Sequence, residues 1–116
     1  MKTISPASVA TQIELPVEQI AEFCRRWKIA KLEIFGSILR DDFQSESDID
    51  FLYTPAHGFQ RNQAYGPWAH NNMAEELSAL LGREVDLIDR HEIEQHRNWI
   101  RRKHILETAQ PIYVEG

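Results

Sequence analysis

Apolar residues follow two different spacings along the chain, and these spacings predict the order of helices and strands. Three segments carry apolar residues at the helical period, and three short apolar runs are typical of strands. The helical segments are residues 16–28, 68–82 and 98–109, and the strand-like runs are residues 31–36, 48–53 and 83–89. A short helix is also expected after Gly36, whereas residues 54–67 hold two prolines and two glycines and are expected to form a loop. The order α-β-α-β-α-β-α favours a single α/β domain over residues 1–116, with residues 1–15 as a loose N-terminal segment.

The three tryptophans fall on the apolar sides of the predicted helices. Trp27, Trp68 and Trp99 are therefore expected in the core, as is Ile100 beside Trp99. Trp68 also follows the predicted loop, so a role in lining a partner's groove stays open. Basic residues near Trp99 are expected to form a solvated helix face; the alternative is contact with an acidic partner surface or with an RNA bound to that partner. They are Arg97, Arg101, Arg102 and Lys103.

Acidic residues stand at regular positions in two of the predicted strands. Side chains on a strand alternate between the two faces of a sheet, so Asp48, Asp50 and Leu52 share one face. By the same alternation Asp86 shares a face with Ile88. If the two strands are neighbours, Asp86 can join the other two carboxylates.

Carboxylates placed this way suit a metal ion. Asp48 and Asp50 are separated by about 6–7 Å along the strand, and two ionised carboxylates repel each other unless a cation or a proton lies between them. Mg²⁺ is the simplest stabiliser, because it binds a few carboxylates together with waters and substrate phosphates. The alternative for an isolated D-x-D sequence is structural: Asp48 caps the strand and Asp50 is exposed.

A glycine-serine pair follows the first predicted strand. Gly36 would let backbone N–H groups approach a phosphate, Ser37 adds a hydroxyl donor, and the N-terminus of a following helix favours an anion. Such a pair is also an ordinary turn. Arg40 could bind triphosphate oxygens or could pair with Asp41 or Asp42 instead. Three converging carboxylates, a phosphate-binding turn and a cation would make a phosphoryl- or nucleotidyl-transfer site.

The overall charge narrows the choice of partners. Thirteen Lys and Arg residues against eighteen Asp and Glu residues leave a net charge of −5, which argues against a general binder of nucleic-acid backbones. A single nucleotide is still compatible, because a metal ion can supply local positive charge. One cysteine, Cys24, cannot form an intrachain disulfide, and the sequence shows neither a signal peptide nor a membrane span. A cytoplasmic location and no membrane partner are therefore expected.

The stretch from Gly36 to Asp50 resembles a known signature. Gly36-Ser37, ten intervening residues and Asp48-Ile49-Asp50 are similar to the G-S-x10-D-x-D pattern of the nucleotidyltransferase superfamily that includes DNA polymerase β. The longer string FGSILRDDFQSESDIDFLY resembles the small bacterial and archaeal members, the minimal nucleotidyltransferases. The strings LLGREVDLID and RRKHILETAQPIYVEG resemble the family's third-carboxylate strand and its closing helix and tail.

The resemblance implies both a fold and a set of roles. The fold would be the polymerase β-like palm, a mixed β-sheet with helices packed against it. Asp48 and Asp50 would bind a pair of Mg²⁺ ions, and Asp86 would be the third carboxylate, helping to hold the ion that activates the incoming hydroxyl. Gly36 and Ser37 would hold the β- and γ-phosphates of ATP, the donor.

The resemblance also implies a partner. Minimal nucleotidyltransferases are usually encoded beside a HEPN-domain RNase toxin and silence it by transferring AMP to one of its tyrosines, which would make this chain the antitoxin of a type VII-like toxin–antitoxin pair. The family's larger members have a second helical domain that is not seen here, so a hetero-oligomer with the HEPN partner, or a homodimer, is expected to complete the active face. No direct contact with nucleic acid is expected. Two other functions stay open: a non-catalytic antitoxin that covers the toxin, and a small-molecule (aminoglycoside-type) nucleotidyltransferase.

Overall fold

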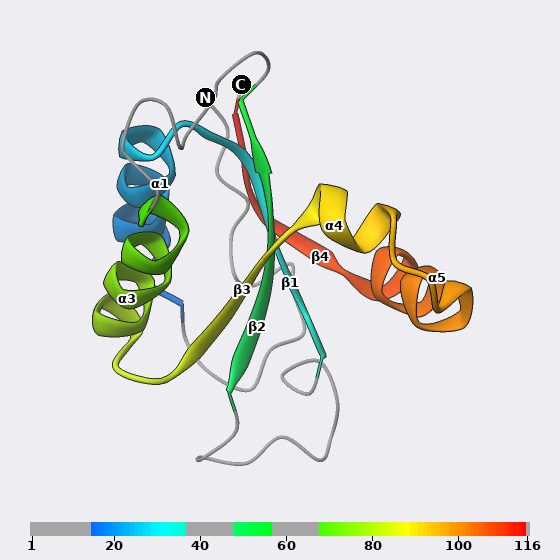
Figure 1. Cartoon of the computed structure of the whole chain (residues 1–116). Helices are drawn as coiled ribbons and strands as arrows, with labels where there is room; N and C mark the ends of the chain where they lie inside the picture. The colour runs from blue at the N-terminus through cyan, green and yellow to red at the C-terminus, as the bar shows by residue number, and fades with distance from the viewer. Residues whose placement is uncertain (1–14, 37–47, 57–67, 116) are drawn as a thin grey trace.

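The centre of the protein is a four-stranded mixed β-sheet. The computed structural model describes residues 15–36, 48–56 and 68–115. The strands lie in the order β3-β2-β1-β4, as Figure 1 shows. Their bounds are β1 (Ile29–Phe35), β2 (Ile49–Pro55), β3 (Val85–Asp89) and β4 (Gln110–Val114). Strand β1 is antiparallel to β2 and to β4, whereas β2 and β3 are parallel, which confirms the mixed sheet with packed helices.

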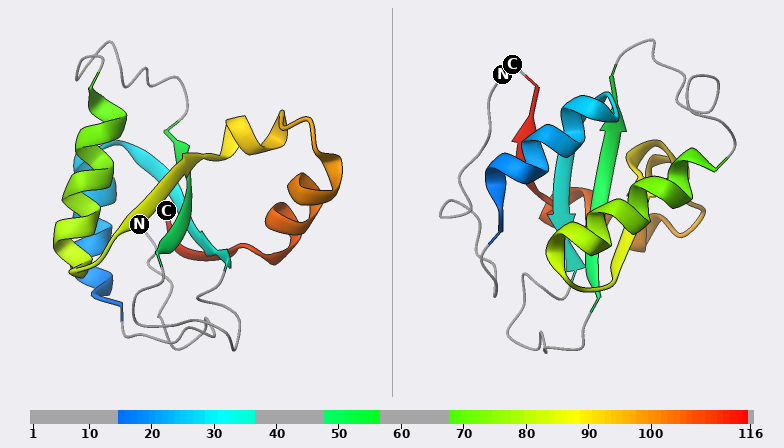
Figure 2. Two further views of the ribbon diagram at one scale, coloured as in Figure 1. Left: turned by 60° about the horizontal axis from the view of Figure 1, so that its bottom comes forward. Right: turned by 90° about the vertical axis from the view of Figure 1, so that its left-hand side faces the viewer.

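Helices cover both faces of the sheet. One face is covered by α1 (Val17–Arg26) and α3 (Ala69–Leu81), which lie side by side (Figures 1 and 2). The short α4 (Arg90–Glu94) and α5 (Trp99–Thr108) lie on the opposite side (Figure 1). Helix α3 ends at Gly82, whose φ of 70° is the left-handed conformation that glycine adopts most easily after a helix. Among the described residues, no helix is long and apolar enough to cross a membrane.

The face under α1 and α3 is closed by one apolar cluster. Strand β2 contributes Ile49, Phe51 and Tyr53, none of them more than 1% exposed. Burial of each such side chain stabilises the fold by about 1.5–3 kcal/mol before entropy is counted. The other buried members come from the segment before α1 and from the remaining elements: Leu15, then Ile20, Ala21, Phe23 and Cys24 of α1, Ile29, Leu32 and Ile34 of β1, Met73 and Leu77 of α3, Leu87 of β3, and Ile112 and Tyr113 of β4.

A smaller apolar cluster lies on the opposite face. Phe35 of β1 and Leu52 of β2 pack there against Ile93 of α4 and Ile105 of α5, with Ile88 of β3 partly buried beside them. Leu52 thus lies on the other face from its neighbours Phe51 and Tyr53, which confirms the predicted alternation along β2.

Two elements were absent from the sequence prediction. Helix α4 follows β3 directly, with Asp89 as its N-cap residue accepting a hydrogen bond from the backbone N–H of His91 at 2.8 Å. Strand β4 contains Pro111, a residue that is found in strands mainly at the edge of a sheet, and β4 is an edge strand. The short helix expected after Gly36 and most of the loop expected over residues 54–67 lie outside the described residues. Thr54 and Pro55 belong to β2 rather than to that loop.

The expected burial of the tryptophans is wrong for two of the three. Trp27 packs against the larger cluster, and its Nε1 donates to Oε1 of Glu76 at 3.0 Å. Trp68 and Trp99 are 71% and 60% exposed, and Ile100 is 64% exposed. Trp68 precedes the first residue of α3, and Trp99 and Ile100 begin α5, so all three stand at helix starts rather than over the sheet.

Candidate active site

Two of the predicted site residues are neighbours across the sheet. The parallel pairing of β2 with β3 matches Asp50 with Asp86, so their α-carbons lie about 4.8 Å apart, the usual spacing of neighbouring strands. The side chains of two residues that are paired across neighbouring strands project from the same face of the sheet. Asp48 immediately precedes β2 and is two residues from Asp50, which places it on that face by alternation. The two acidic strands are therefore neighbours, which meets the condition under which Asp86 can join the other carboxylates.

These aspartates lie beside the part of the face that α4 and α5 cover. Leu52 and Ile88, each two residues further along its strand, belong to the smaller apolar cluster. Asp48 and Asp86 are exposed, and Asp50 is half-buried. The carboxylates therefore occupy an accessible part of the sheet at the edge of an apolar cluster.

Gly36 lies in direct contact with Asp50. Its φ of 84° is in the left-handed region that favours glycine, at the end of β1. A β-carbon at this position would overlap Oδ2 of Asp50 and would lie 3.2 Å from its Cγ. The contact follows from the register, because Phe35 pairs with Asp50 across β1 and β2. Two predicted parts of the site, the glycine of the turn and a carboxylate, thus adjoin each other, and no other residue type fits the turn as it stands.

The remaining predicted phosphate ligands, Ser37 and Arg40, lie outside the described residues. They stay predictions, as do the ligand roles of the three aspartates.

The predicted Mg²⁺ site can be tested against the side chains that lie close enough together to bind a metal ion. Within residues 15–36, 48–56 and 68–115, no group of three or more His, Cys, Asp or Glu side chains is close enough to hold a metal ion. A protein cage of three carboxylates is therefore not preformed by Asp48, Asp50 and Asp86. Mg²⁺ commonly takes only one or two carboxylates and completes its shell with waters and substrate phosphates. The registered pair Asp50 and Asp86 fits that second kind of site.

A buried ion pair on the same face was missed by the sequence reasoning. Glu33 is 4% exposed, and it faces the α4 side because it pairs with Leu52 across β1 and β2. Its Oε1 accepts from Nη1 of Arg90 at 2.5 Å, and Nζ of Lys31 lies 3.7 Å from its Oε2. Partial burial is the largest single influence and lowers the pKa of Arg90, but the hydrogen bonds and negative charges of Glu33 and Glu94 together outweigh it, so the pKa of Arg90 is raised. The pair joins β1 to the first residue of α4, which fixes that helix beside the carboxylates.

The sequence offered one weak signal for this pair. Glu33 interrupts an apolar run between Leu32 and Ile34, and a charge there is costly unless it is paired. Nothing local identified its partner, which is 57 residues away.

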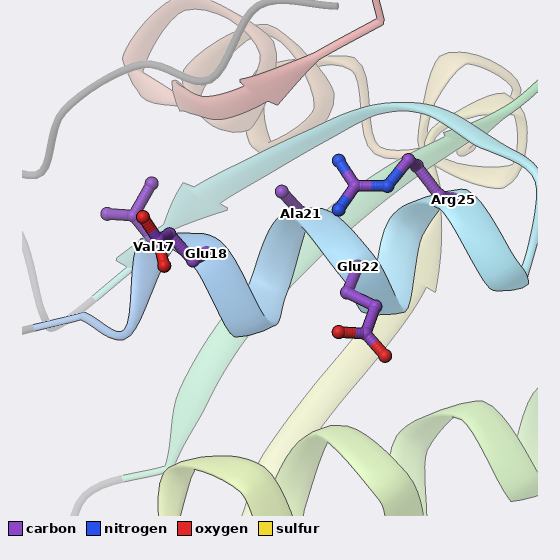
Figure 3. A pocket seen from close by; sticks show the side chains of 5 residues that line it. All are labelled: Val17, Glu18, Ala21, Glu22 and Arg25. Atoms are coloured by element: carbon purple, nitrogen blue, oxygen red, sulfur yellow. The ribbon is translucent and has the colours of Figure 1, made fainter.

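A surface hollow of about 560 Å³ lies elsewhere, along α1 (Figure 3). Its lining residues all belong to that helix: Val17, Glu18, Ala21, Glu22 and Arg25. Helix α1 covers the opposite face of the sheet, so this hollow is separate from the aspartates and carries no part of the predicted site.

Comparison with known proteins gives one family. The family described as nucleotidyltransferase domain matches residues 17–111. Compared with curated proteins, the chain has no significant match.

Several solved structures share the fold. A chain of a toxin–antitoxin structure with AMP-PNP is 20% identical, with a TM-score of 0.62, and the match covers 86% of this chain and 74% of that one. A proposed minimal nucleotidyltransferase is 24% identical, with a TM-score of 0.59 and coverage of 81% and 86%. A chain from the tri-AMPylated Shewanella oneidensis HEPN toxin in complex with MNT antitoxin is 19% identical, with a TM-score of 0.52 and coverage of 84% and 68%. At these identities the likeness establishes the arrangement of helices and strands.

Proposed function

Because the chain belongs to the nucleotidyltransferase domain family, we propose that it transfers AMP from ATP to a tyrosine hydroxyl of a HEPN-domain toxin and so acts as that toxin's antitoxin. The observation that carries the proposal is the pairing of Asp50 with Asp86 next to Gly36. Solved structures of the same fold include a toxin–antitoxin with AMP-PNP and a tri-AMPylated HEPN toxin with its MNT antitoxin, which supports AMP as the group and a HEPN protein as the acceptor. We expect the reaction to take place in the cytoplasm, the location predicted from the sequence.

The proposed chemistry is a displacement at the α-phosphorus of ATP. The acceptor's hydroxyl oxygen forms a bond to that phosphorus, the bond to the oxygen bridging to the β-phosphorus breaks, and pyrophosphate leaves with the electron pair while the hydroxyl proton passes to solvent. Asp48, Asp50 and Asp86 would hold Mg²⁺ together with the phosphates. When bound, Mg²⁺ offsets the charge that builds on the leaving group and lowers the pKa of the attacking hydroxyl.

Residues of this chain would position the phosphates and the acceptor hydroxyl. Gly36 has no side chain, and the Asp50 carboxylate lies in the space that a β-carbon would fill. A phosphate held by the backbone of this turn would therefore lie close to that carboxylate, and a bound cation would offset the repulsion between the two anions. Asp86 is exposed, so an acceptor hydroxyl can reach it from solvent. The roles of Ser37 and Arg40 as phosphate ligands rest on the sequence pattern. The ion pair of Glu33 with Arg90 holds α4 in place at the border of the site.

The test is transfer of label. The purified chain is incubated with the HEPN-domain protein encoded by the neighbouring reading frame, MgCl₂ and ATP labelled at the α-phosphate. Label is expected on the HEPN protein, at a tyrosine identified by mass spectrometry. Chelation of Mg²⁺ with EDTA should abolish the transfer.

Variants then connect the activity to the site. Asp48→Asn and Asp50→Asn should each reduce transfer about 1,000-fold, a loss typical of removing one charge-stabilising group. The matched control is Glu75→Gln, an exposed acidic residue of α3 on the opposite face, which should transfer normally. Transfer that persists in the Asp50→Asn variant would refute the assigned site. If the toxin is neutralised without any label, or by these variants as well as by the wild type, the chain acts by covering its partner instead.

A further inference from the structure

The start of α5 carries an exposed apolar pair. Trp99 and Ile100 are adjacent in the chain and are 60% and 64% exposed. Single exposed apolar residues are ordinary, but an exposed tryptophan with an apolar neighbour is the composition of an interface anchor. We use the name "α5 patch" for these two residues together with the exposed Arg97, Arg101 and Lys103.

The α5 patch is held in a defined conformation. The side-chain Oδ1 of Asn98 accepts from the backbone N–H of Arg101 at 3.1 Å, which caps the helix. The backbone N–H of Asn98 lies 3.1 Å from Nδ1 of His96, and Nη1 of Arg102 donates to the carbonyl of His96 at 3.0 Å. A surface ordered before binding loses less conformational entropy when a partner docks.

The charge of the α5 patch indicates the chemistry of the partner. Residues 97–104 hold four basic residues and no acidic one, in a chain whose net charge is −5. In the part of the chain that the structure describes, none of these four basic side chains forms a salt bridge with an acidic residue. The complementary surface is therefore acidic around an apolar pocket.

The α5 patch also lies on the same side of the sheet as the aspartates. Ile105 of α5 packs with Phe35 and Leu52, and Phe35 is the register partner of Asp50. Ile100 is five residues nearer the start of the helix, which is about 7.5 Å along its axis. A protein seated on the α5 patch would thus stand on the side of the sheet that carries Asp50 and Asp86.

We propose that the α5 patch is the surface on which the acceptor protein docks, with Trp99 and Ile100 entering an apolar pocket rimmed by Asp and Glu residues. This inference rests on the proposed function, because it takes the docked protein to be the acceptor of AMP. The binding energy would come from the apolar pair, and the basic residues would speed association and fix its orientation.

The experiment measures binding and transfer separately. Affinity for the HEPN-domain protein of the neighbouring reading frame is measured by isothermal titration calorimetry for the wild type, for Trp99→Ser with Ile100→Ser, and for Trp68→Ser. The double variant should bind about 30-fold more weakly or worse. Trp68→Ser is the matched control, because Trp68 is also largely exposed but is the N-cap residue of α3, which covers the opposite face, and the affinity of this variant should stay within about 3-fold of the wild type. Equal melting temperatures for the three chains show that they fold alike.

The charge of the α5 patch is tested with Arg97→Glu combined with Lys103→Glu. This variant should associate about 10-fold more slowly, and raising the salt concentration should narrow its difference from the wild type. Transfer by Trp99→Ser with Ile100→Ser should recover at saturating HEPN protein, because the carboxylates are untouched.

The outcomes separate this inference from the proposed function. Loss of affinity in the double variant without any transfer by the wild type would leave the docking surface standing and would remove the proposed function. Unchanged affinity in the double variant, with transfer by the wild type, would overturn the docking surface alone. Light scattering that shows a wild-type dimer, monomeric only in the double variant, would assign the α5 patch to a second copy of this chain. Binding of a single-stranded RNA oligonucleotide that charge reversal abolishes, with HEPN binding unchanged, would assign it to RNA; both results overturn the proposal.

Discussion

The face of the sheet under α1 and α3 is closed by one apolar cluster. The face under α4 and α5 instead combines accessible aspartates, a smaller apolar cluster and the ion pair of Glu33 with Arg90. The closed face takes Ile49, Phe51 and Tyr53 from β2. The other face takes Asp50 and Leu52 from the same strand, one exposed enough to bind a ligand and the other packed under the helices. Along a single strand, alternate positions thus serve stability and chemistry.

The difference shows how a small domain can hold a polar site without losing its core. The closed face supplies most of the apolar burial, so the opposite face can leave the aspartates accessible to solvent. Where that face does bury a charge, at Glu33, it also supplies a cationic partner in Arg90.

The sharpest test of this contrast uses two consecutive residues of β2. Phe51→Ala should lower the free energy of unfolding by about 3–5 kcal/mol, because it leaves a cavity in the closed face. Asp50→Asn should change the free energy of unfolding by less than about 1 kcal/mol but should lower AMP transfer about 1,000-fold. Urea denaturation and the label-transfer assay measure the two effects. A stability loss of several kcal/mol in Asp50→Asn would mean that this residue is part of the structural framework.

The next test removes one member of the buried ion pair. Arg90→Met should destabilise the fold by about 2–4 kcal/mol, because Glu33 is left buried with only the more distant Lys31 nearby. The double variant Glu33→Leu with Arg90→Met should recover most of that loss, since apolar residues can replace a buried pair. Chemical denaturation of the wild type and of the two variants measures these changes in the free energy of unfolding. Equal destabilisation of the single and double variants would show that the pair acts through something other than its charges.

Gly36, which follows β1, lies against the Asp50 carboxylate. Gly36→Ala should lower the free energy of unfolding by about 1–2 kcal/mol, because alanine is strained at a φ of 84°. It should also lower transfer, because the added methyl group has to displace the Asp50 carboxylate. Thermal unfolding and the transfer assay give the two values. Wild-type activity in this variant would mean that the position of the Asp50 carboxylate beside Gly36 is unimportant.

The smallest effect on stability is expected for the ion pair that joins α3 to α1. Glu76 of α3 pairs with Arg26 of α1, and the hydrogen bond from Arg26 lowers the pKa of Glu76 against the opposing effect of desolvation. A lowered folded-state pKa stabilises the protein above the usual carboxyl pKa of 4.5, and this contribution disappears as the pH falls through the folded-state value. It amounts to about 0.5–1 kcal/mol, because the Arg26 side chain is 51% exposed.

Melting temperatures of the wild type and of Glu76→Gln, followed from about pH 6 to pH 3, would measure this contribution. The gap between the two proteins should be largest near neutral pH and should close in acid. A gap that widens as the pH falls would contradict the assigned sign.

The strands that carry the aspartates were predictable from the sequence, and the reason is their strict alternation. In D-I-D-F-L-Y the period of two separates Asp50 from Phe51 without further information. The register between β2 and β3 was only conditional, because the adjacency of two strands depends on contacts between distant parts of the chain. Ser37 and Arg40 stay predictions from the signature.

Other features could not be predicted because local sequence carries little signal for them. Helix α4 has five residues and one buried apolar side chain, Ile93, too few to show a helical period. Strand β4 contains Pro111, and because proline is rare in strands its presence argues against predicting one there. Trp99 and Ile100 were expected inside because apolar residues on a helix usually face the core, yet α5 buries its second half, at Ile105.

The proposed function depends on the Asp50 and Asp86 carboxylates, beside Gly36, binding the metal ion and the triphosphate together. The most direct measurement is a crystal structure grown with MnCl₂ and AMP-PNP, in which anomalous scattering locates the metal. We expect an anomalous peak coordinated by oxygens of Asp50 and Asp86, with the triphosphate against the backbone of Gly36. A peak bound elsewhere, with neither carboxylate among its ligands, would contradict it.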